Sequence, residues 1–229
     1  MLYIVATPIG NLEDVSTRQA RILLESDIIL AEDTRSAHTL LSYMNKTFKV
    51  VSNPKQKIIS YYREKEFEKL PDVLDALSTG LSIALISESG MPLVSDPGFL
   101  LVKEAIKAGI QITAIPGPSA VINSLILSGF EPKNFMYVGF LPKKASQLTS
   151  LITRLKKISE ISPSSLFVAY ESPNRINATL KIMAKESPEV DMAICREMSK
   201  KFEEVVRGMP ADLLNRDYRG EITIVLRFE

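Results

Sequence analysis

The side chains that most often carry catalysis are scarce in this chain of 229 residues. His38 is its only histidine and Cys195 its only cysteine. A serine or cysteine nucleophile needs a neighbouring base, usually a histidine, so a Ser-His-Asp or Cys-His system is poorly supported. One histidine and one cysteine also fall short of the usual ligands of a zinc site. The sequence therefore favours a reaction in which a cofactor supplies the chemistry.

Five segments share one arrangement, in which an apolar run ends in a loop rich in proline, glycine and serine. The loops are Thr7–Gly10, Ser87–Gly98, Pro116–Ala120, Gly139–Pro142 and Tyr170–Pro173. In open α/β sheets, ligands bind outside the carboxyl ends of the strands. The five loops therefore predict a lined cleft for a small molecule. The first loop has no glycine-rich phosphate-binding pattern, and Pro8 removes a backbone donor from it.

A cleft with few titratable groups suits a ligand that is held mainly by its shape and by backbone contacts. Methyl transfer from a sulfonium donor fits such a cleft, because the donor is already activated. The step is an in-line displacement, in which positioning supplies most of the acceleration. These residues permit methyl transfer without proving it.

Composition and charge narrow the class of protein. The chain is 45% hydrophobic and 24% charged, as in soluble globular proteins, and its net charge is +1. No apolar run approaches the ~20 residues of a membrane helix, and the first run, Met1–Ala6, is typical of a strand rather than a signal peptide. The lone Cys195 favours a reducing cytoplasm. The small net charge means that any nucleic-acid contact must use local patches.

The elements that must position the loops alternate in type through the first half of the chain. Ser16 and Gln19 fit a capping box, which predicts a helix toward Ser26. A second helix is predicted from an apolar face that ends before Gly80 and consists of Phe67, Leu70, Leu74 and Leu77. Strands are predicted at Leu2–Ala6, Ile28–Ala31, Ile58–Tyr61, Ser82–Ile86 and Gln111–Ile115. This alternation predicts a mostly parallel sheet covered on both faces.

The pattern changes after Pro116, and a mixed sheet is predicted for the second half. A clear amphipathic helix is marked by Leu148, Leu151, Ile152, Leu155 and Ile158. Strands are predicted at Phe135–Phe140, Ser165–Tyr170, Asp191–Arg196 and Glu221–Phe228, the last with strong alternation. We therefore expect an α/β protein with two domains, residues 1–115 and 116–229, and a cleft between them.

Seven segments match, in order, the motifs of one known family. They are Leu2–Asp14, Ala31–Arg35, Pro92–Gly98, Ile115–Ala120, Val138–Lys144, Tyr170–Arg175 and Arg196–Gly208. Together they resemble the tetrapyrrole-methylase superfamily of S-adenosylmethionine-dependent methyltransferases, and within it the enzymes that methylate the 2′-oxygen of a cytidine ribose in small-subunit ribosomal RNA. The resemblance implies two α/β domains with the cofactor in the cleft between them, and a homodimer. From the resemblance we expect the protein to bind neither a membrane nor DNA.

The resemblance also implies which residues contact the cofactor. They are Pro8 and Ile9 after the first strand, Gly90, Met91, Pro92 and Val94 in the glycine-proline loop, Ser119 and Ala120 in the next loop, and Tyr170 in the second domain. The chain departs from the family's pattern in several places, among them Glu88 in place of an aspartate, Met91 in place of a threonine and Asn174 in place of a histidine. Met91 removes a hydroxyl beside the cofactor, so cofactor affinity is the property that we expect to differ most.

A ribose hydroxyl is a poor nucleophile and needs a proton acceptor as the methyl group arrives. We predict Asp33 or Glu171 in that role, with Arg35 and Arg175 holding phosphate. Glu32, Glu197 and Lys200 are further candidates on the RNA side. The alternative for the residues near Asp33 is a local ion pair that caps a helix.

A basic strip on the RNA side is predicted from Lys143, Lys144, Arg154, Lys156 and Lys157, with a solvated helix face as its alternative. Two other functions stay open: methylation of a small molecule such as a porphyrinoid, and non-catalytic binding on the same scaffold.

Overall fold

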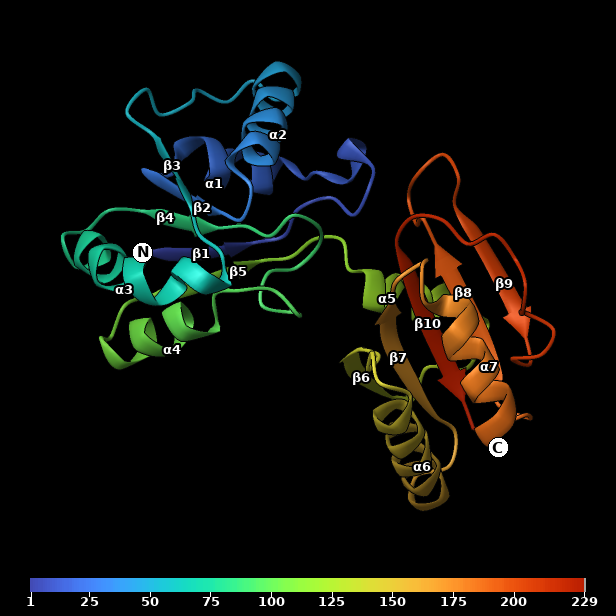
Figure 1. Cartoon of the computed structure of the whole chain (residues 1–229). Coiled ribbons are helices and arrows are strands. Elements are labelled where there is room, and N and C mark those ends of the chain that lie inside the picture. Colours follow the sequence, from blue (N-terminus) through green and yellow to red (C-terminus); the bar gives the residue numbers. More distant parts are fainter. Residues whose placement is uncertain (229) are drawn as a thin grey trace. The chain divides into compact units, whose positions relative to one another are not determined.

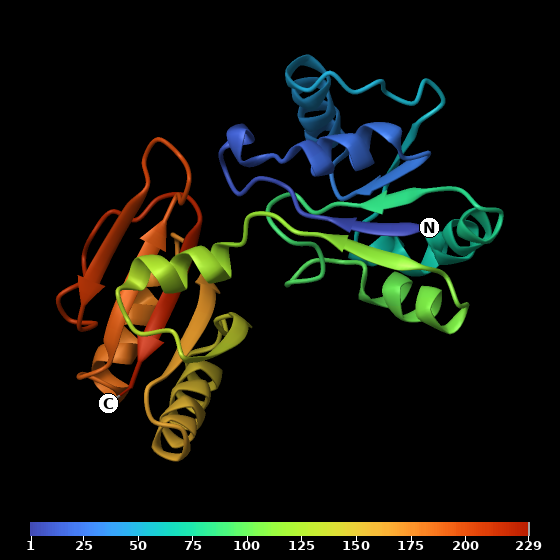
Figure 2. The same ribbon diagram turned by 180° about the vertical axis from the view of Figure 1, so that it is seen from behind.

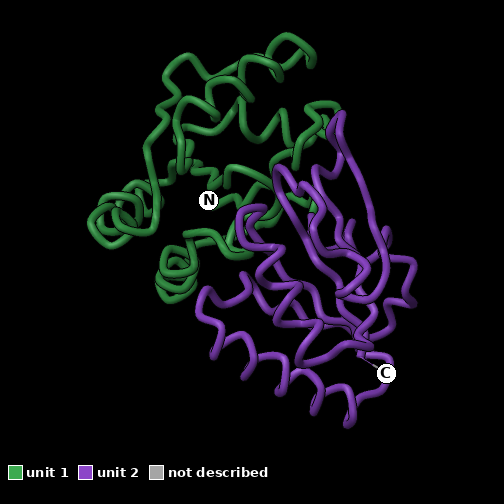
Figure 3. The backbone as a smooth tube through the Cα atoms, turned by 45° about the vertical axis from the view of Figure 1, so that its right-hand side comes forward, with its two compact units in different colours: residues 1–119 green, residues 120–229 purple. Residues whose placement is uncertain are grey.

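The structure is a computed structural model, and it describes residues 1–228. These residues form two compact units that divide between Ser119 and Ala120, a few residues after Ile115 (Figure 3). Each unit has its own sheet and its own buried core, so each is described by itself.

The first unit is built on a five-stranded parallel sheet in the order β3-β2-β4-β1-β5 (Figure 1). Its strands are β1 (Leu2–Val5), β2 (Ile28–Ala31), β3 (Lys57–Ser60), β4 (Ile83–Leu85) and β5 (Ile112–Ile115). The predicted parallel sheet is confirmed, with strand ends that differ from the prediction by at most one residue. Apolar runs mark these strands because β2 and β4 are buried along their whole length.

Helices cover both faces of this sheet. On one face, α1 (Thr17–Glu25) and α2 (Thr34–Thr47) share a core with Val5 and Ile29. On the other face, α3 (Arg63–Ser78) and α4 (Phe99–Lys107) share a core with Ile4 and Leu30. Successive side chains of a strand point to opposite faces, which is why Ile29 and Leu30 belong to different cores.

The helix ends follow local chemistry. Ser16 Oγ accepts the Gln19 N–H at 3.1 Å and Gln19 Oε1 accepts the Ser16 N–H at 2.6 Å, which confirms the capping box. The predicted inward face of α3 is wrong at Phe67, which is 81% exposed. The neighbouring Glu66 faces inward instead, because its carboxylate accepts the backbone N–H groups of Leu100 and Leu101 at the start of α4.

The second unit has a mixed five-stranded sheet in the order β6-β7-β10-β8-β9, in which only β6 and β7 are parallel. Its strands are β6 (Asn134–Phe140), β7 (Ser165–Glu171), β8 (Asp191–Arg196), β9 (Glu204–Gly208) and β10 (Ile222–Arg227). Helix α5 (Ala120–Ser128) lies across one face (Figure 2). Helices α6 (Ala145–Ile161) and α7 (Ile176–Glu186) cover the other.

Two features of this unit go beyond the sequence prediction. Helix α7 and strand β9 were not predicted. The last strand was predicted with strong alternation, and in the structure β10 is central with its first five residues buried. Val225 packs under α5 whereas Ile224 and Leu226 belong to the core under α6 and α7. A short 3-10 helix, η1 (Leu12–Asp14), completes the elements. Within residues 1–228, no helix is long and apolar enough to cross a membrane.

Candidate active site

The loop that follows β4 occupies a special place in the first sheet. The chain leaves β4 toward the face covered by α3 and α4, whereas it leaves the neighbouring strands β1 and β2 toward the face covered by α1 and α2. Such a change of direction between adjacent parallel strands marks the point at which open α/β sheets bind ligands. The loop Ser87–Gly98 therefore lies where the topology favours a site.

Hydrogen bonds join this loop to the loop after β1. The Thr7 N–H donates to the Gly90 carbonyl at 2.9 Å, and the Gly90 N–H donates to the Thr7 carbonyl at 3.2 Å. The Thr7 hydroxyl also donates to the Ser87 carbonyl at 3.1 Å. Both partners are buried, so these bonds fix the position of Pro8 and Ile9 relative to Gly90.

The loop after β5 reaches the same place. A Cβ atom on Gly90 would stand 3.3 Å from the Ile9 side chain and 3.5 Å from the Pro118 carbonyl oxygen. Gly90 also has a φ of +83°, which side chains rarely adopt. The first unit thus brings together the predicted loops around Ile9, Gly90 and Ser119 at one edge of its sheet.

Backbone strain is concentrated in the loop after β4. Leu93 and Ser95 adopt φ values of 70° and 77°, in the left-handed region that non-glycine residues avoid. Gly98 has a φ of 114°, and a Cβ atom there would stand 2.4 Å from a methyl carbon of Leu85. Strained residues of this kind persist only where the surroundings hold them, and they cluster at functional sites.

Carboxylates gather beside this loop, from the ends of adjacent strands. Glu32 follows β2, and Glu88 and Asp96 follow β4. Glu88 Oε1 accepts the backbone N–H of Asp33 at 2.9 Å, which ties the two loops together. The longer arm of Glu88, compared with the family's aspartate, therefore has a structural use.

Asp96 is a residue that the sequence analysis did not single out. Burial raises the pKa of its carboxyl to about 6. The nearby Glu88 adds to this increase, whereas a hydrogen bond from Ser87 and the positive charge of Arg63 oppose it. Burial also raises the pKa of Glu32, and Asp96 and Glu88 reinforce that shift. Asp96 is thus a half-buried carboxyl with a pKa raised to about 6. Its only signal in the sequence is its place in the motif Pro92–Gly98.

Asp33 and Arg35 form a tight pair at the start of α2. Asp33 caps the helix by accepting the Arg35 N–H at 2.8 Å, and it also accepts the Arg35 Nε–H at 3.0 Å. Hydrogen bonds from the Arg35 side chain lower the pKa of Asp33 to about 2. This geometry fits the alternative given from the sequence, in which the residues near Asp33 form a local ion pair that caps a helix. The Arg35 side chain is 90% exposed, so it can still meet an anion.

Glu171 and Arg175, in the second unit, are tied to each other. The Glu171 side chain is fully buried and forms a salt bridge with Arg175. It also accepts the Thr179 hydroxyl and the Ser172 N–H, both at 2.6 Å. Arg175 donates further to the Leu141 carbonyl at 3.2 Å. Both oxygens of this carboxylate therefore have partners within the unit.

The remaining predicted residues of the second unit also lie in local networks. The Tyr170 ring packs edge-on against Tyr137 at 5.2 Å and Phe140 at 5.3 Å between ring centres. Lys200 pairs with Glu197 and Glu221, each at 3.0 Å. Of the cofactor residues, those from Pro8 to Ser119 lie in the first unit, and Ala120 and Tyr170 lie in the second.

Comparison with known proteins decides the family. Residues 1–213 match the family described as tetrapyrrole (corrin/porphyrin) methylases. The chain belongs to this family. Relatives of this methylase include a protein of Halalkalibacterium halodurans, 41% identical over 90% of the chain and 67% of the relative. Another, from Thermotoga maritima, is 36% identical over 98% of the chain and 97% of the relative. Both are named ribosomal RNA small subunit methyltransferase I.

Solved structures agree with the fold of this tetrapyrrole methylase. The methyltransferase CobJ superposes with a TM-score of 0.70 over 99% of this chain and 93% of its own, at 16% identity. Diphthine synthase superposes with a TM-score of 0.71 over 99% of this chain and 89% of its own, at 13% identity. At such low identity these structures support the predicted α/β fold and carry no information about the substrate.

Proposed function

We propose that this methylase transfers a methyl group from S-adenosylmethionine to small-subunit ribosomal RNA, at the 2′-oxygen of a cytidine ribose. The observation that carries the proposal is the similarity to proteins named ribosomal RNA small subunit methyltransferase I. In the comparison with the Thermotoga maritima protein, the similarity spans nearly the whole length of this chain and of the relative. The geometry of the loops in the first unit supports it.

The residues of the first unit fit the cofactor. A Cβ atom at Gly90 would stand 3.3 Å from the Ile9 side chain and 3.5 Å from the Pro118 carbonyl oxygen, so the three loops leave little room beside this turn. Apolar side chains and backbone groups suit a neutral adenosine, and the nearby Glu88 and Asp96 suit a ligand that carries positive charge. S-adenosylmethionine supplies a methyl group that is activated by a sulfonium. We propose that it contacts the residues named for it from the sequence: Pro8, Ile9, Gly90, Met91, Pro92, Val94, Ser119, Ala120 and Tyr170.

The proton of the ribose hydroxyl needs an acceptor, and three carboxylates are compared for this role. Asp33 is a weak base because its pKa is about 2. Glu171 is buried with both oxygens in use. Asp96 is half-buried with a pKa raised to about 6, so it is ionised at pH 7 and still basic enough to take a proton. We therefore add Asp96 to the proposal as the acceptor, with Asp33 and Glu171 as the alternatives, and Arg35 and Arg175 as phosphate contacts.

The experiment that tests the function is transfer of tritiated methyl groups from S-adenosylmethionine to purified small ribosomal subunits. We expect label in the RNA at a ribose that resists alkaline cleavage, and mapping of that nucleotide identifies the base. Asp72→Asn, which alters an exposed carboxylate on α3, is the matched control for Asp96→Asn. Label in a porphyrinoid but not in the subunits would instead support the small-molecule alternative. Binding of the cofactor without any transfer would support the non-catalytic alternative.

Two further expectations from the family resemblance are part of the proposal. We expect a homodimer, which sedimentation equilibrium measures. We also expect the protein in the cytoplasm, in keeping with its single, buried Cys195.

A further inference from the structure

Helix α4 begins without a capping side chain of its own. The residue before it is Gly98, which has no side chain to accept the first backbone N–H groups of the helix. Glu66 of helix α3 takes that place, because its Oε1 accepts the Leu100 N–H at 3.1 Å and the Leu101 N–H at 3.3 Å. Helices α3 and α4 lie side by side on one face of the sheet (Figure 1). The start of α4 is therefore held by a side chain of another helix.

Glu66 occupies this position in spite of the cost of burying a carboxylate. Within residues 1–119 it is the only charged side chain that is buried, and it is 9% exposed. It takes part in no salt bridge among residues 1–228. The N–H groups and the positive end of the α4 dipole offset part of the burial cost. An apolar side chain would avoid that cost, so the carboxylate is better explained by the position that it gives to α4.

The loop Ser87–Gly98 ends where α4 begins. Hydrogen bonds from Thr7 fix the first part of this loop. Its last part contains Leu93 and Ser95, whose left-handed backbone persists only where the surroundings hold it. Asp96 lies in the same part, directly before the turn into α4. Because the chain is continuous, a shift at the start of α4 would move the backbone around Asp96. The carboxylate from α3 therefore gives this loop a second attachment, at the end opposite to Thr7.

The first turn of α3 acts on the same loop at a second point. Arg63 precedes Glu66 by one turn, and residues three apart lie on the same side of a helix. Burial raises the pKa of the Asp96 carboxyl, and the positive charge of Arg63 opposes this increase. One turn of α3 thus meets both Asp96 and the helix that follows it.

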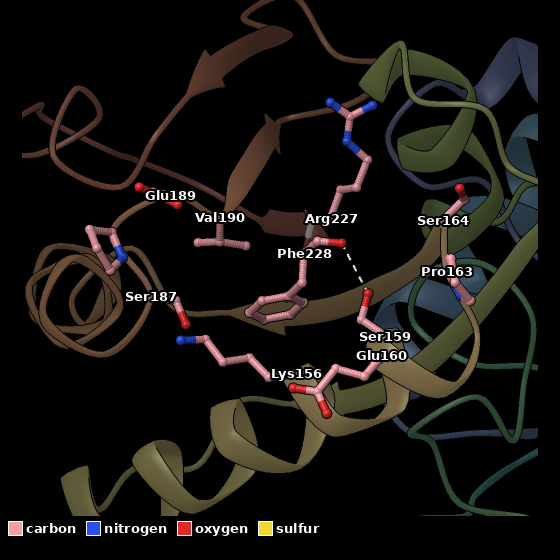
Figure 4. Close-up of a pocket in the computed structure, with 11 residues that line it drawn as sticks. Lys156, Ser159, Glu160, Pro163, Ser164, Ser187, Glu189, Val190, Arg227 and Phe228 are labelled. Atoms are coloured by element: carbon pink, nitrogen blue, oxygen red, sulfur yellow. Dashed lines mark hydrogen bonds between the residues drawn. The ribbon is translucent and has the colours of Figure 1, made fainter.

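The second unit contains the same arrangement with the opposite charge. Lys156 of α6 donates to the carbonyl of Glu186, the last residue of α7, at 2.6 Å. It turns into a pocket of about 620 Å³ that lies where α6 and α7 end (Figure 4). A cation at the end of a helix and an anion at its start both match the helix dipole. No residue proposed for the cofactor lines this pocket, so Lys156 is a matched control for Glu66.

The contact of Lys156 with α7 divides the predicted basic strip. Lys156 is engaged at the end of α7, whereas the other members are exposed: Lys143, Lys144, Arg154 and Lys157. The pocket itself is lined by two acidic and two basic side chains, Glu160, Glu189, Lys156 and Arg227. Its charge therefore favours neither an anion nor a cation, and we assign it no ligand.

We propose that Glu66 is a positioning residue for methyl transfer. By binding the start of α4, its carboxylate holds the last part of the loop Ser87–Gly98 in the conformation in which Val94 contacts S-adenosylmethionine and Asp96 accepts the proton. Glu66 itself contacts neither the cofactor nor the substrate. This inference rests on the proposed function, to which it adds the side chain that sets the position of the loop.

Glu66→Ala tests the proposal by calorimetry with S-adenosylmethionine. If the loop without its second attachment is in its binding conformation in about a tenth of the molecules, the affinity falls about tenfold. Misplacement of Asp96 should also lower kcat about 100-fold in the tritium-transfer assay. Lys156→Ala removes the same kind of contact from the second unit. It should lower the midpoint of urea unfolding but leave the affinity and kcat unchanged.

Two conservative variants separate the reach of the side chain from its charge. Glu66→Gln keeps the length and an oxygen that can accept both N–H groups, so its affinity and kcat should stay within about threefold of the wild type. Glu66→Asp keeps the charge but is shorter by one methylene, so it should resemble Glu66→Ala. A mere loss of stability would not produce this order. Equal losses in the two variants, or a normal Glu66→Asp protein, overturn the proposal, even where Glu66→Ala does not fold.

Hydrogen exchange locates the effect without a measurement of activity. The amide protons of Leu100 and Leu101 should exchange faster in Glu66→Asp than in the wild type, whereas those of α1 and α2 should not change. Unchanged exchange at the start of α4, or normal affinity and kcat in Glu66→Asp, overturns this inference and leaves the proposed function standing. Absence of S-adenosylmethionine binding by the wild-type protein overturns the proposed function, and this inference with it.

Discussion

The two units hold their carboxylates in opposite ways. At the edge of the first sheet, Asp96 is half-buried among other acidic groups, and its pKa is raised to about 6. At the end of β7 in the second unit, Glu171 is fully buried but has a salt bridge and two hydrogen bonds. Burial against like charges leaves a carboxyl ready to exchange a proton, whereas burial with full partners makes it part of the scaffold. The comparison predicts chemistry in the first unit and structural support in the second.

The largest effect is expected for Asp96→Asn. A general base contributes about 10²- to 10⁴-fold to a rate, so kcat should fall by at least about 100-fold while calorimetry shows unchanged binding of S-adenosylmethionine. Asp33→Asn should lower kcat much less, because Asp33 is held as an anion by Arg35. If Asp33→Asn lowers the rate of tritium transfer more than Asp96→Asn does, Asp33 rather than Asp96 is the base.

Glu171→Ala should act on stability. Removal of one partner of a buried ion pair costs about 3–5 kcal/mol, because the Arg175 charge is left without compensation. Urea unfolding followed by circular dichroism should show this loss, whereas Glu160→Ala, at an exposed site, should leave the midpoint unchanged. A Glu171→Gln protein that is stable and binds cofactor but has no activity would show that Glu171 takes part in the reaction, contrary to its structural role in this comparison.

Gly90→Ala tests the close approach of the loops in the first unit. Both Gly90 and Gly109 have a positive φ, so alanine at either position costs about 1 kcal/mol through backbone strain. Only at Gly90 would the new methyl group meet neighbours, at 3.3 Å from Ile9, whereas the space at Gly109 is open. Calorimetry should therefore show about tenfold weaker binding of S-adenosylmethionine, ~1.4 kcal/mol, for Gly90→Ala, and no change for Gly109→Ala. Equal affinities of Gly90→Ala and Gly109→Ala for S-adenosylmethionine would show that the turn at Gly90 does not contact the cofactor.

The smallest effect expected is that of pH. The pKa of Asp96 is raised in the folded chain, so the folded state binds more protons than the unfolded state between about pH 4 and 6. Its contribution to stability therefore falls as pH rises through this window, while kcat/KM rises as the base ionises near pH 6. Asp96→Asn should flatten both profiles. A pH–rate profile of the wild type without a step near pH 6 would contradict the assignment.

The sequence predicted the first sheet well because each strand is a short apolar run followed by a loop with strong turn residues. Strand β2 was predicted at its observed bounds, Ile28–Ala31. The capping box of Ser16 and Gln19 was found because both partners lie within one turn. Such features depend on neighbours in the sequence, which is why they can be predicted.

What the sequence did not reveal depends on contacts between distant segments. The pKa of Asp96 depends on Arg63 and on its depth in the fold. The inward turn of Glu66 depends on the N–H groups of α4, some 35 residues away. The strong alternation of the last strand did not reveal that β10 is buried on both faces, because a periodicity of two does not tell whether the second face meets water or a helix.

The order of the strands has a consequence for synthesis of the chain. Strand β1 is made first but pairs with β4 and β5, and Leu2 lies opposite Ile112. The centre of the second sheet likewise awaits β10, which separates β7 from β8. The earliest apolar segment must therefore stay unpaired until β4 is made about eighty residues later, at roughly 5–20 residues per second. Each unit thus closes late on the ribosome, and the interval before closure is when a growing chain most needs a chaperone.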